Sequence, residues 1–367
     1  VQLKKYSVNV SENGYNAAMK LYRHLFDHIA SKETLFTAWE EFRKGKQARK
    51  DVQEFERRLE QNLFALHREL KAGTYRHKPY SAFTICDPKQ RRIHKASVQD
   101  RVLHHAVFSV LNPVFEPTFV AHSFSCQKGK GTHKAVNALD RMLKSVSRNS
   151  ARSCFVLKCD VHQFFASVDH DTLLSIIERR VKDEKTIALL REIIGSFVAK
   201  DPNLFGKTGI PIGNLTSQLF ANVYLNEFDQ FIKQRLKIKH YIRYTDDFVI
   251  VSKSYKELED YLELIRSFLK EKLHLHLHPH KVSVRKYKQG IDFLGYVLLP
   301  HHRVLRTKTK RRMYRRLRES VIMHKAGILT EERVESSLQS YLGVLCHADS
   351  HDEQEELLNR YWFWITE

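Results

Sequence analysis

The segment HYIRYTDDFVIVSK, residues 240–253, constrains the fold of this 367-residue chain more than any other segment. Two runs of β-branched and aromatic residues are joined by Tyr244-Thr245-Asp246-Asp247. Such runs around a short polar link predict a tight β-hairpin with two adjacent carboxylates at its tip. Neighbouring acids on a strand point to opposite faces, but a hairpin tip relaxes that alternation. Asp246 and Asp247 are therefore candidates for one shared site.

A third carboxylate stands at the end of another apolar strand. The run FVLKCDV, residues 155–161, predicts a buried strand that ends at Asp160. If this strand and the hairpin lie side by side, Asp160 and Asp246 converge, with Asp247 close behind. Divalent cations would neutralise such a cluster, and its hard oxygen ligands favour Mg²⁺, with Mn²⁺ as the alternative. Two ions about 3.5 to 4 Å apart would activate a 3′-hydroxyl and stabilise a leaving pyrophosphate.

The simpler interpretation of Asp246 and Asp247 is that they only hydrogen-bond their own backbone, as Asp residues commonly do in turns. The aromatic residue before the pair and the apolar runs on both sides favour a shared site. Asp160 at the end of a separate apolar run points the same way.

The charge of the chain predicts its partner. It has 62 Lys or Arg and 42 Asp or Glu, a formal charge of +20, while 42 % of its residues are hydrophobic. That apolar content predicts folded lobes, so the positive excess lies on their surfaces and a polyanion is expected to bind. The polar first residues and the lack of an apolar run of roughly 18 residues predict a cytoplasmic protein with no membrane partner. Five scattered cysteines without CxxC spacing predict reduced thiols.

Residue patterns divide the chain into four regions. Residues 15–72 are helical and charged, with one apolar stripe closed by Gly73; its members are Val52, Phe55, Leu59, Leu63, Leu66 and Leu70. Residues 76–150 combine short β-prone pieces, basic loops and one helix, Val98 to Leu111. Residues 151–300 hold the strongest strand signals, SCFVLKCDV, HYIRY, FVIVS and GIDFLGYVLL, with helices near 171–195 and 216–236. This alternation predicts an α/β or α+β core.

Several segments resemble motifs of reverse transcriptases. Tyr244 to Asp247 resembles their YxDD box, and Asp160 with VHQFFASVDH resembles the first catalytic motif of bacterial enzymes of the group II intron type. GIPIGNLTSQLFANVYLNEFD, residues 209–229, resembles the motif beneath the incoming nucleotide. Residues 91–101 and 122–136 resemble the finger motifs of the family, and residues 293–296 resemble the motif that supports the primer. The match covers roughly residues 80–300 in the family's order.

This resemblance implies an α+β right-hand polymerase with a helical N-terminal layer. The expected parts are the N-terminal layer at 1–75, fingers at 76–150, a palm with an antiparallel sheet at 151–300, a finger insertion at about 172–206, and a helical thumb at 301–367. It also implies RNA-directed synthesis of cDNA by two-metal-ion nucleotidyl transfer. Template RNA, the cDNA or primer, and deoxynucleoside triphosphates are then the partners.

One difference from the usual family motif indicates which reverse transcriptases this chain most resembles. Most reverse transcriptases carry Gln-Gly and then Ser-Pro in the middle motif, whereas this chain has Ile212-Gly213 and Ser217-Gln218. The pattern IGNLTSQ resembles reverse transcriptases of diversity-generating retroelements, encoded by bacteria or phages. That implies copying of a template-repeat RNA, misincorporation opposite adenine, and a small basic accessory variability protein, expected to be oligomeric. The alternatives are a retron or phage-defence reverse transcriptase and a non-catalytic RNA-binding scaffold with a polymerase fold.

The resemblance also implies roles around the carboxylates. Asp160 and Asp246 bridge both ions, Asp247 tunes the site, and the backbone carbonyl of Val161 completes one ion's shell. Lys281 follows LHLHLHPH in the region where polymerases place a proton donor for pyrophosphate, although a solvated lysine looks the same. In that stretch Leu273, Leu275 and Leu277 are expected to face the core from a strand; the alternative is a metal site formed by His274, His276 and His278.

Other implied roles concern the nucleotide. Phe165 is the expected steric gate against a ribose 2′-hydroxyl, although it could instead seal the strand end with Phe164. Arg91 is expected to hold the triphosphate, and Lys95 could share that task or face solvent. Ile212, Gly213 and Gln218 shape the nucleotide pocket. Ile212 offers shape where Gln would offer hydrogen bonds, which predicts lower fidelity; the alternative is drift at a tolerant packing position.

After Pro300 the chain becomes strongly basic. Nine Arg or Lys and no acid lie between Arg303 and Arg318. Eight of them are candidate contacts to the nucleic-acid backbone: Arg303, Arg306, Lys308, Lys310, Arg311, Arg312, Arg315 and Arg316. The alternative is a solvated helix face. The terminal YWFW, residues 361–364, is expected to dock against the preceding helix, the alternative being base stacking.

Overall fold

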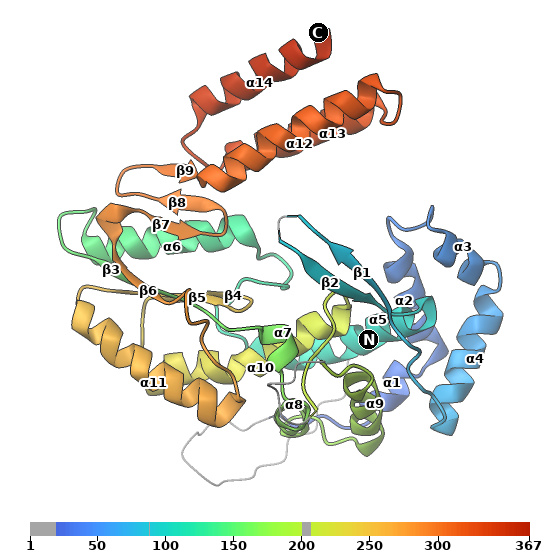
Figure 1. The fold of residues 1–367 in the computed structure, drawn as a ribbon. Helices are drawn as coiled ribbons and strands as arrows, with labels where there is room; N and C mark the ends of the chain where they lie inside the picture. Colours follow the sequence, from blue (N-terminus) through green and yellow to red (C-terminus); the bar gives the residue numbers. More distant parts are fainter. Residues whose placement is uncertain (1–19, 88, 200–206) are drawn as a thin grey trace. The chain divides into compact units, whose positions relative to one another are not determined.

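The computed structural model describes residues 20–87, 89–199 and 207–367 (Figure 1). Residues 1–19 of the expected N-terminal layer and 200–206 of the expected finger insertion lie outside the described residues, as does residue 88. The chain divides into two compact units. The first comprises Val1–Gln127, Val161–Lys237 and Leu264–Pro279; the second comprises Lys128–Asp160, Ile238–Glu263 and His280–Glu367.

The first unit begins with four helices: α1 (Leu25–Ile29), α2 (Lys32–Arg43), α3 (Lys50–Glu56) and α4 (Leu59–Ala72). Gly73, at a φ of 68°, ends α4 as predicted. The prediction of one continuous helix through the apolar stripe is wrong, because the chain leaves helical geometry at Arg58, with φ −128° and ψ 39°. The break brings the Phe55 ring to 5.2 Å from that of Trp39, while Leu63 and Leu66 are buried on α4.

Two long helices, α5 (Val98–Phe115) and α10 (Leu215–Gln230), pack together in the first unit. The predicted helix from Val98 is confirmed, and the Ser97 hydroxyl accepts a hydrogen bond from Asp100 N at 3.2 Å at its start. Most of α5 is buried, which makes it the centre of this unit's core. The remaining elements are β1 (Ser81–Ile85), β2 (Arg91–Lys95), η1 (Glu116–Thr118), α7 (Phe164–Ser167), α8 (His170–Glu178), α9 (Glu184–Gly195) and η2 (Phe231–Arg235).

The second unit is built on a four-stranded antiparallel sheet of order β4-β5-β3-β6. Its strands are β3 (Phe155–Asp160), β4 (Tyr241–Tyr244), β5 (Asp247–Ser252) and β6 (Ser283–Lys286). The hairpin predicted at residues 240–253 is confirmed as β4 and β5. Helix α6 (Thr132–Ser147) packs against both strands of the hairpin. Helix α11 (Tyr255–Leu273) follows β5, beginning in the second unit and ending in the first.

Two strand predictions outside this sheet need correction: the strand signal in GIDFLGYVLL corresponds to two strands rather than one, and the described residues 273–277 do not form the expected strand. GIDFLGYVLL is a hairpin, β7 (Ile291–Phe293) and β8 (Tyr296–Leu298), because Leu294 and Gly295 turn the chain at φ values of 49° and 93°. Strand β9 (Arg303–Leu305) completes that second sheet. The expected strand at 273–277 is also absent among the described residues: Leu273 ends α11, and Leu277 makes only an isolated bridge with Val161. Leu273 and Leu275 are buried as expected, since each still faces the core.

Three helices end the chain: α12 (Thr307–Lys325), α13 (Glu331–Leu345) and α14 (His351–Thr366). Tyr361 is buried, as docking of YWFW requires, but Trp362 and Phe363 are more than half exposed.

All five cysteines are free, as predicted. None of the described helices combines the length and the apolar character that crossing a membrane requires.

Candidate active site

Two carboxylates face each other across the central strands of the four-stranded sheet. Asp160 is the last residue of β3 and pairs in register with Asp247, the first residue of β5. Cross-strand partners of this kind present their side chains on the same face of a sheet. Asp247 also closes the hairpin opposite Tyr244, so Asp246 lies in the two-residue turn between them. The strand ends thus bring together the acids that stand 87 positions apart in the sequence.

The turn that carries Asp246 has a strained backbone and is fixed by hydrogen bonds to and beside it. Thr245 adopts a φ of 55°, a conformation that a β-branched residue rarely takes. The guanidinium of Arg243, which is 1 % exposed, donates a hydrogen bond from Nη1 to the Thr245 carbonyl oxygen at 3.0 Å. The Thr132 hydroxyl, at the start of α6, donates to the Tyr244 hydroxyl at 3.2 Å. These contacts position the turn, and with it the carboxylate of Asp246.

One carboxylate of this cluster, Asp247, has a raised proton affinity. Burial raises the pKa of Asp247 to about 6, and the negative charges of Asp160 and Asp246 act in the same direction. The positive charge of Lys158 on β3 opposes them. Lys158 itself donates from Nζ to the carbonyl oxygen of Asp292 at 2.9 Å. Ionised Asp247 is therefore incompletely compensated by the residues around it.

A second lysine contacts the cluster directly. Lys281 Nζ donates to both carboxylate oxygens of Asp160, at 2.8 Å each. The antiparallel pairing of β6 with β3 explains this position. Lys158 is opposite Ser283, so continuing the same register by two residues places Lys281 opposite Asp160. Asp160 therefore has a carboxylate on one side and an ammonium on the other.

The donor set fits a hard divalent cation. Carboxylate oxygens are the ligands that Mg²⁺ and Mn²⁺ prefer, and the raised pKa of Asp247 marks uncompensated negative charge. In the arrangement that residues 20–87, 89–199 and 207–367 adopt, no three His, Cys, Asp or Glu side chains are grouped as a ready metal site. The ammonium of Lys281 contacts both oxygens of Asp160, so an ion at Asp160 requires the ammonium to move aside. Within the same ranges, His274, His276 and His278 do not form a metal-binding group either.

The residues expected at the nucleotide lie in the first unit. The backbone N–H of His94 on β2 donates to the Ile212 carbonyl oxygen at 3.2 Å, which ties the strand of Arg91 and Lys95 to the segment before α10. Gly213 has a φ of 112°, and a Cβ there would lie 3.0 Å from Ile93 Cγ2. This close approach requires glycine. Gln218 is exposed on the first turn of α10.

Arg91 and Lys95 differ in their surroundings. Arg91 is exposed at the start of β2, whereas Lys95 forms an ion pair with Asp51 at 2.7 Å. The carboxylate of Asp51 also accepts from the Arg101 guanidinium at 2.5 Å. Lys95 is thus committed to a partner on α3, and Arg91 is the freer of the two to meet an external anion.

The two phenylalanines after β3 also differ. Phe164 is 1 % exposed, as expected for a core residue, and Phe165 is partly exposed, with its ring 5.4 Å from that of Phe164. The Phe165 carbonyl oxygen accepts from Ile210 N at 2.7 Å, which links it to the middle motif. Val161 is buried and bridged to Leu277.

The basic run after Pro300 divides into two groups. Arg303, Arg306 and Lys310 pair with acids of their own unit: Arg303 with Asp140 at 3.8 Å, Arg306 with Asp292, and Lys310 with Glu356 at 3.5 Å. Arg312 is partly buried on α12. The others expose their side chains on α12, namely Lys308, Arg311, Arg315 and Arg316. This exposed group can meet a nucleic-acid backbone without breaking an ion pair of the first group, and within it Arg315 lies 3.7 Å from Glu319 on the same helix.

Sequence reasoning missed two residues of the site, Arg243 and Lys158. Both are cations placed within apolar β-strand runs, YIRY and FVLKC. A charged residue on a strand that is otherwise apolar is the signal that could have identified them, because such a residue needs a buried partner.

Comparison with known proteins gives a consistent result. A family model described as "Reverse transcriptase (RNA-dependent DNA polymerase)" matches residues 78–298, which is more than half of the chain. Protein YkfC of Escherichia coli K12 is 27 % identical over 291 residues, covering 69 % of this chain and 74 % of YkfC. The group II intron-encoded protein LtrA of Lactococcus lactis is 24 % identical over 306 residues. That match covers 65 % of this chain but only 49 % of LtrA.

Among solved structures, telomerase from Candida albicans in complex with a fragment of telomeric RNA matches 80 % of this chain and 61 % of its own. The sequence identity is 12 % and the TM-score 0.46.

Proposed function

Because this chain belongs to the reverse transcriptase family and is an RNA-directed DNA polymerase with a right-hand polymerase fold, we propose that it serves a diversity-generating retroelement. In this role it copies a template-repeat RNA into cDNA and misincorporates opposite template adenines, in the cytoplasm of a bacterium. The observation that carries the polymerase chemistry is the pairing of Asp160 with Asp247 beside the Asp246 turn. The observation that favours the retroelement is Ile212-Gly213 followed by Gln218 in place of the usual residues.

The parts of the polymerase correspond to ranges of residues. Residues 20–75 form the described part of the N-terminal helical layer, and 76–150 form the fingers. Residues 151–300 form the palm with an inserted finger segment, and 301–367 form the thumb. The exposed cations of α12 then follow the template and primer backbone, and a small basic accessory protein helps to hold the RNA.

Asp160, Asp246 and Asp247 would hold two Mg²⁺ ions, with the Val161 carbonyl as a further ligand. When bound, the ions activate the primer 3′-hydroxyl and neutralise charge on the leaving pyrophosphate. The residues of the chain do the remaining work. Lys281 Nζ, beside Asp160, gives a proton to the leaving pyrophosphate, and the Arg91 guanidinium orients the triphosphate.

Selection of the nucleotide rests on shape. The partly exposed ring of Phe165 excludes a ribose 2′-hydroxyl by contact. Gly213 lets the backbone after Ile212 approach β2 closely, so the floor of the pocket is fixed by main-chain contacts. Ile212 has no hydrogen-bonding side chain with which to test the nascent base pair. Discrimination therefore weakens, most of all opposite adenine.

Sequencing of cDNA tests this function. Wild type and Ile212→Gln should extend a primer on defined RNA templates, with Asp246→Ala as the inactive control. We expect wild type to make errors concentrated opposite adenine and Ile212→Gln to reduce them. Equal extension by wild type and Asp246→Ala would overturn the catalytic assignment. Errors spread evenly over the four template bases would overturn the retroelement assignment alone.

A second candidate is a reverse transcriptase that makes a faithful product, as in an intron, a retron or a phage-defence system. The similarity to the intron-encoded protein LtrA favours it. The same sequencing separates the two candidates, because a faithful enzyme gives a cDNA of fixed sequence without a bias opposite adenine.

A further inference from the structure

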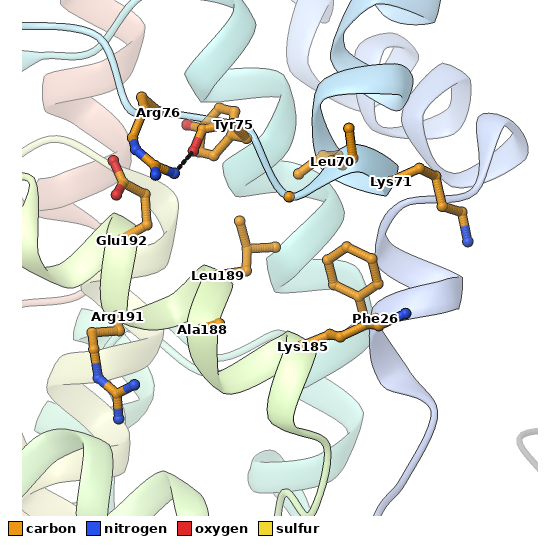
Figure 2. A pocket seen from close by; sticks show the side chains of 12 residues that line it. Phe26, Leu70, Lys71, Tyr75, Arg76, Lys185, Ala188, Leu189, Arg191 and Glu192 are labelled. Carbon is orange, nitrogen blue, oxygen red and sulfur yellow. Dashed lines mark hydrogen bonds between the residues drawn. The ribbon is translucent and has the colours of Figure 1, made fainter.

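A cavity in the first unit lies between α1, the C-terminal end of α4 and α9 (Figure 2). Its volume is about 540 Å³, within the range of sites that bind small molecules. None of its lining residues has a role in the chemistry proposed above. The cavity is therefore a separate candidate site.

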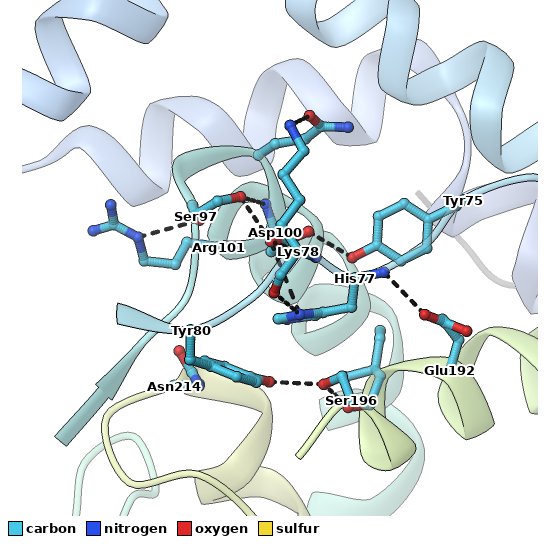
Figure 3. Close-up of polar contacts among 12 residues, drawn as sticks. Tyr75, His77, Lys78, Tyr80, Ser97, Asp100, Arg101, Glu192, Ser196 and Asn214 are labelled. Carbon is cyan, nitrogen blue, oxygen red and sulfur yellow. Dashed lines mark hydrogen bonds and ion pairs between the residues drawn. The ribbon is translucent and has the colours of Figure 1, made fainter. Parts of the chain in front are cut away.

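One side of the cavity is apolar and preformed. Phe26, Leu70 and Leu189 surround the same space in Figure 2, and all three are buried among their neighbours. Tyr75 completes the wall, and its hydroxyl donates to Asp100 Oδ1 at 2.8 Å, which fixes the ring (Figure 3). Such a wall favours a ligand with a flat apolar body.

The rest of the lining is positively charged. Four exposed cations line it, Lys71, Arg76, Lys185 and Arg191, with a single carboxylate, Glu192. Glu192 Oε1 accepts the backbone N–H of His77 at 2.9 Å, so this carboxylate is already engaged (Figure 3).

The four cations differ in the contacts that they make with neighbouring residues. Lys71 pairs with Asp27 at 2.7 Å, and Arg191 lies 3.6 Å from Glu178. Arg76 donates from Nη1 to the Tyr75 carbonyl oxygen at 2.8 Å, and the charge of Lys185 helps to lower the pKa of Asp27 without a direct contact within ion-pair distance in the described ranges. An anionic ligand could therefore reach Lys185 without breaking a direct ion pair.

The wall of the cavity is anchored by a polar network (Figure 3). The Tyr80 hydroxyl and the Ser196 hydroxyl at the end of α9 are 2.8 Å apart, and the Tyr80 ring stacks on that of His77 at 4.7 Å. The hydroxyl contact joins the segment after α4 to α9, which is remote from it in sequence. A ligand in the cavity would therefore enter a site that needs little rearrangement.

We infer that this cavity binds one nucleotide of single-stranded RNA, through residues distinct from those of the proposed chemistry. The base lies against the apolar wall, and its phosphates meet Lys185 and the neighbouring cations. Apolar contact with a base face is tolerant of sequence, because every base has such a face. A free phosphate would leave the apolar wall unused, and an acidic peptide would lack the flat body that the wall favours. RNA is also the polymer that this enzyme must hold.

Two variants of the full-length protein test the inference. Lys185→Glu reverses the charge of one lining cation, and Ala188→Trp fills the cavity from an exposed position of α9. Lys182→Glu is the charge-matched control, since Lys182 is exposed and does not line the cavity. The probe is a fluorescein-labelled 20-nucleotide single-stranded RNA, measured by anisotropy. A second copy carrying 4-thiouridine is photocrosslinked and the attached peptides are mapped. Circular dichroism checks that each variant folds.

We expect Lys185→Glu and Ala188→Trp each to weaken binding by about fivefold or more and Lys182→Glu to change it less than twofold. Crosslinks should map to residues 70–76 or 185–192, and extension on a template with only a short single-stranded overhang should stay at the wild-type rate. Wild-type affinity for Ala188→Trp would overturn the inference. So would equal competition by polyglutamate, which would mark the cavity as a site for acidic peptides. These outcomes leave the polymerase assignment untouched, because they do not depend on incorporation.

Discussion

The ammonium of Lys281 lies 2.8 Å from both carboxylate oxygens of Asp160. The pair follows from the register of β6 against β3, and it occupies the carboxylate that a divalent ion needs. Under the proposed function, Lys281 would compete with the ion for Asp160, and its proton would serve the leaving group.

Replacing Lys281 should separate these two effects. In Lys281→Met we expect the half-saturating Mg²⁺ concentration to fall by about two- to fivefold, because a half-exposed ion pair contributes at most about 1 kcal/mol. We expect kcat to fall by about 10²-fold through loss of the proton donor. Steady-state primer extension over a Mg²⁺ titration measures both. Lys281→Arg, which keeps a cation, should retain the wild-type Mg²⁺ dependence; if it behaves like Lys281→Met, competition for Asp160 is not the cause.

Neutralising Asp247 should stabilise the fold while it abolishes activity. Its folded-state pKa of about 6 lies above the ordinary value of 3.8, so the folded protein binds more protons than the unfolded chain between these values. Wild type therefore loses stability as the pH rises from about 4 to 6, and Asp247→Asn does not. In EDTA we expect Asp247→Asn to exceed wild type in unfolding free energy by about 1 to 2 kcal/mol at pH 8.

Urea unfolding at pH 4 and pH 8 measures this difference, which should shrink at pH 4. Asp260→Asn, at an exposed position of α11, is the control and should show no such pH-dependent gain. A variant Asp247→Asn that is less stable than wild type at pH 8 would contradict the expected cost of burying the ionised carboxylate beside Asp160 and Asp246.

Adding a methyl group at Gly213 should strain the pocket floor. The new Cβ would lie 3.0 Å from Ile93 Cγ2, at a φ of 112° that non-glycine residues avoid. We expect Gly213→Ala to lose about 1 to 3 kcal/mol of stability and to raise the KM for nucleotide. Gly343→Ala is the matched control, because its Cβ would meet nothing within 4 Å inside helix α13 and should stabilise by about 0.5 to 1 kcal/mol. Thermal unfolding and steady-state kinetics compare the two variants. Equal effects on stability and KM would contradict the claim that the close approach of Gly213 to Ile93 matters.

The two groups within the basic run should respond differently to neutralisation. Changing Lys308, Arg311, Arg315 and Arg316 to Gln should weaken primer–template binding and lower its salt slope by up to about 0.9 for each phosphate that the variant no longer neutralises. Changing Arg303 and Arg306 should instead lower the melting temperature, since both pair with acids of their own unit. Anisotropy across a salt series and thermal unfolding distinguish the two. An unchanged salt slope in the fourfold variant would remove α12 from the nucleic-acid interface.

Local patterns in the sequence predicted the parts of the fold that depend on neighbouring residues. The β4–β5 hairpin follows from two apolar runs around a polar link, and the end of α4 follows from Gly73. The turn within β7–β8 was missed because Leu294 takes a positive φ that its side chain does not suggest. The break before α4 was missed because the apolar stripe continues through it.

For the site, strand-end acids indicated which carboxylates would meet, but the cations around them depend on pairing between distant segments. The contact between Lys281 and Asp160 joins residues 121 positions apart, and it arises from the register of two strands. The hydrogen bond from Arg243 depends on which face of β4 is buried. Arg303 belongs to the ion-paired group and Lys308 to the exposed group because of where acids such as Asp140 lie in the fold. No local pattern carries this information.

The two-residue turn between Tyr244 and Asp247 makes the sheet sensitive to a change of length. Side chains alternate between faces along a strand, so one inserted or deleted residue would move every following side chain of β5 to the opposite face. Asp247 would then leave Asp160, and the apolar residues after it would turn away from the core. Random libraries of this gene should accordingly yield folded variants with substitutions around the acids, and almost none with an insertion or deletion in that turn.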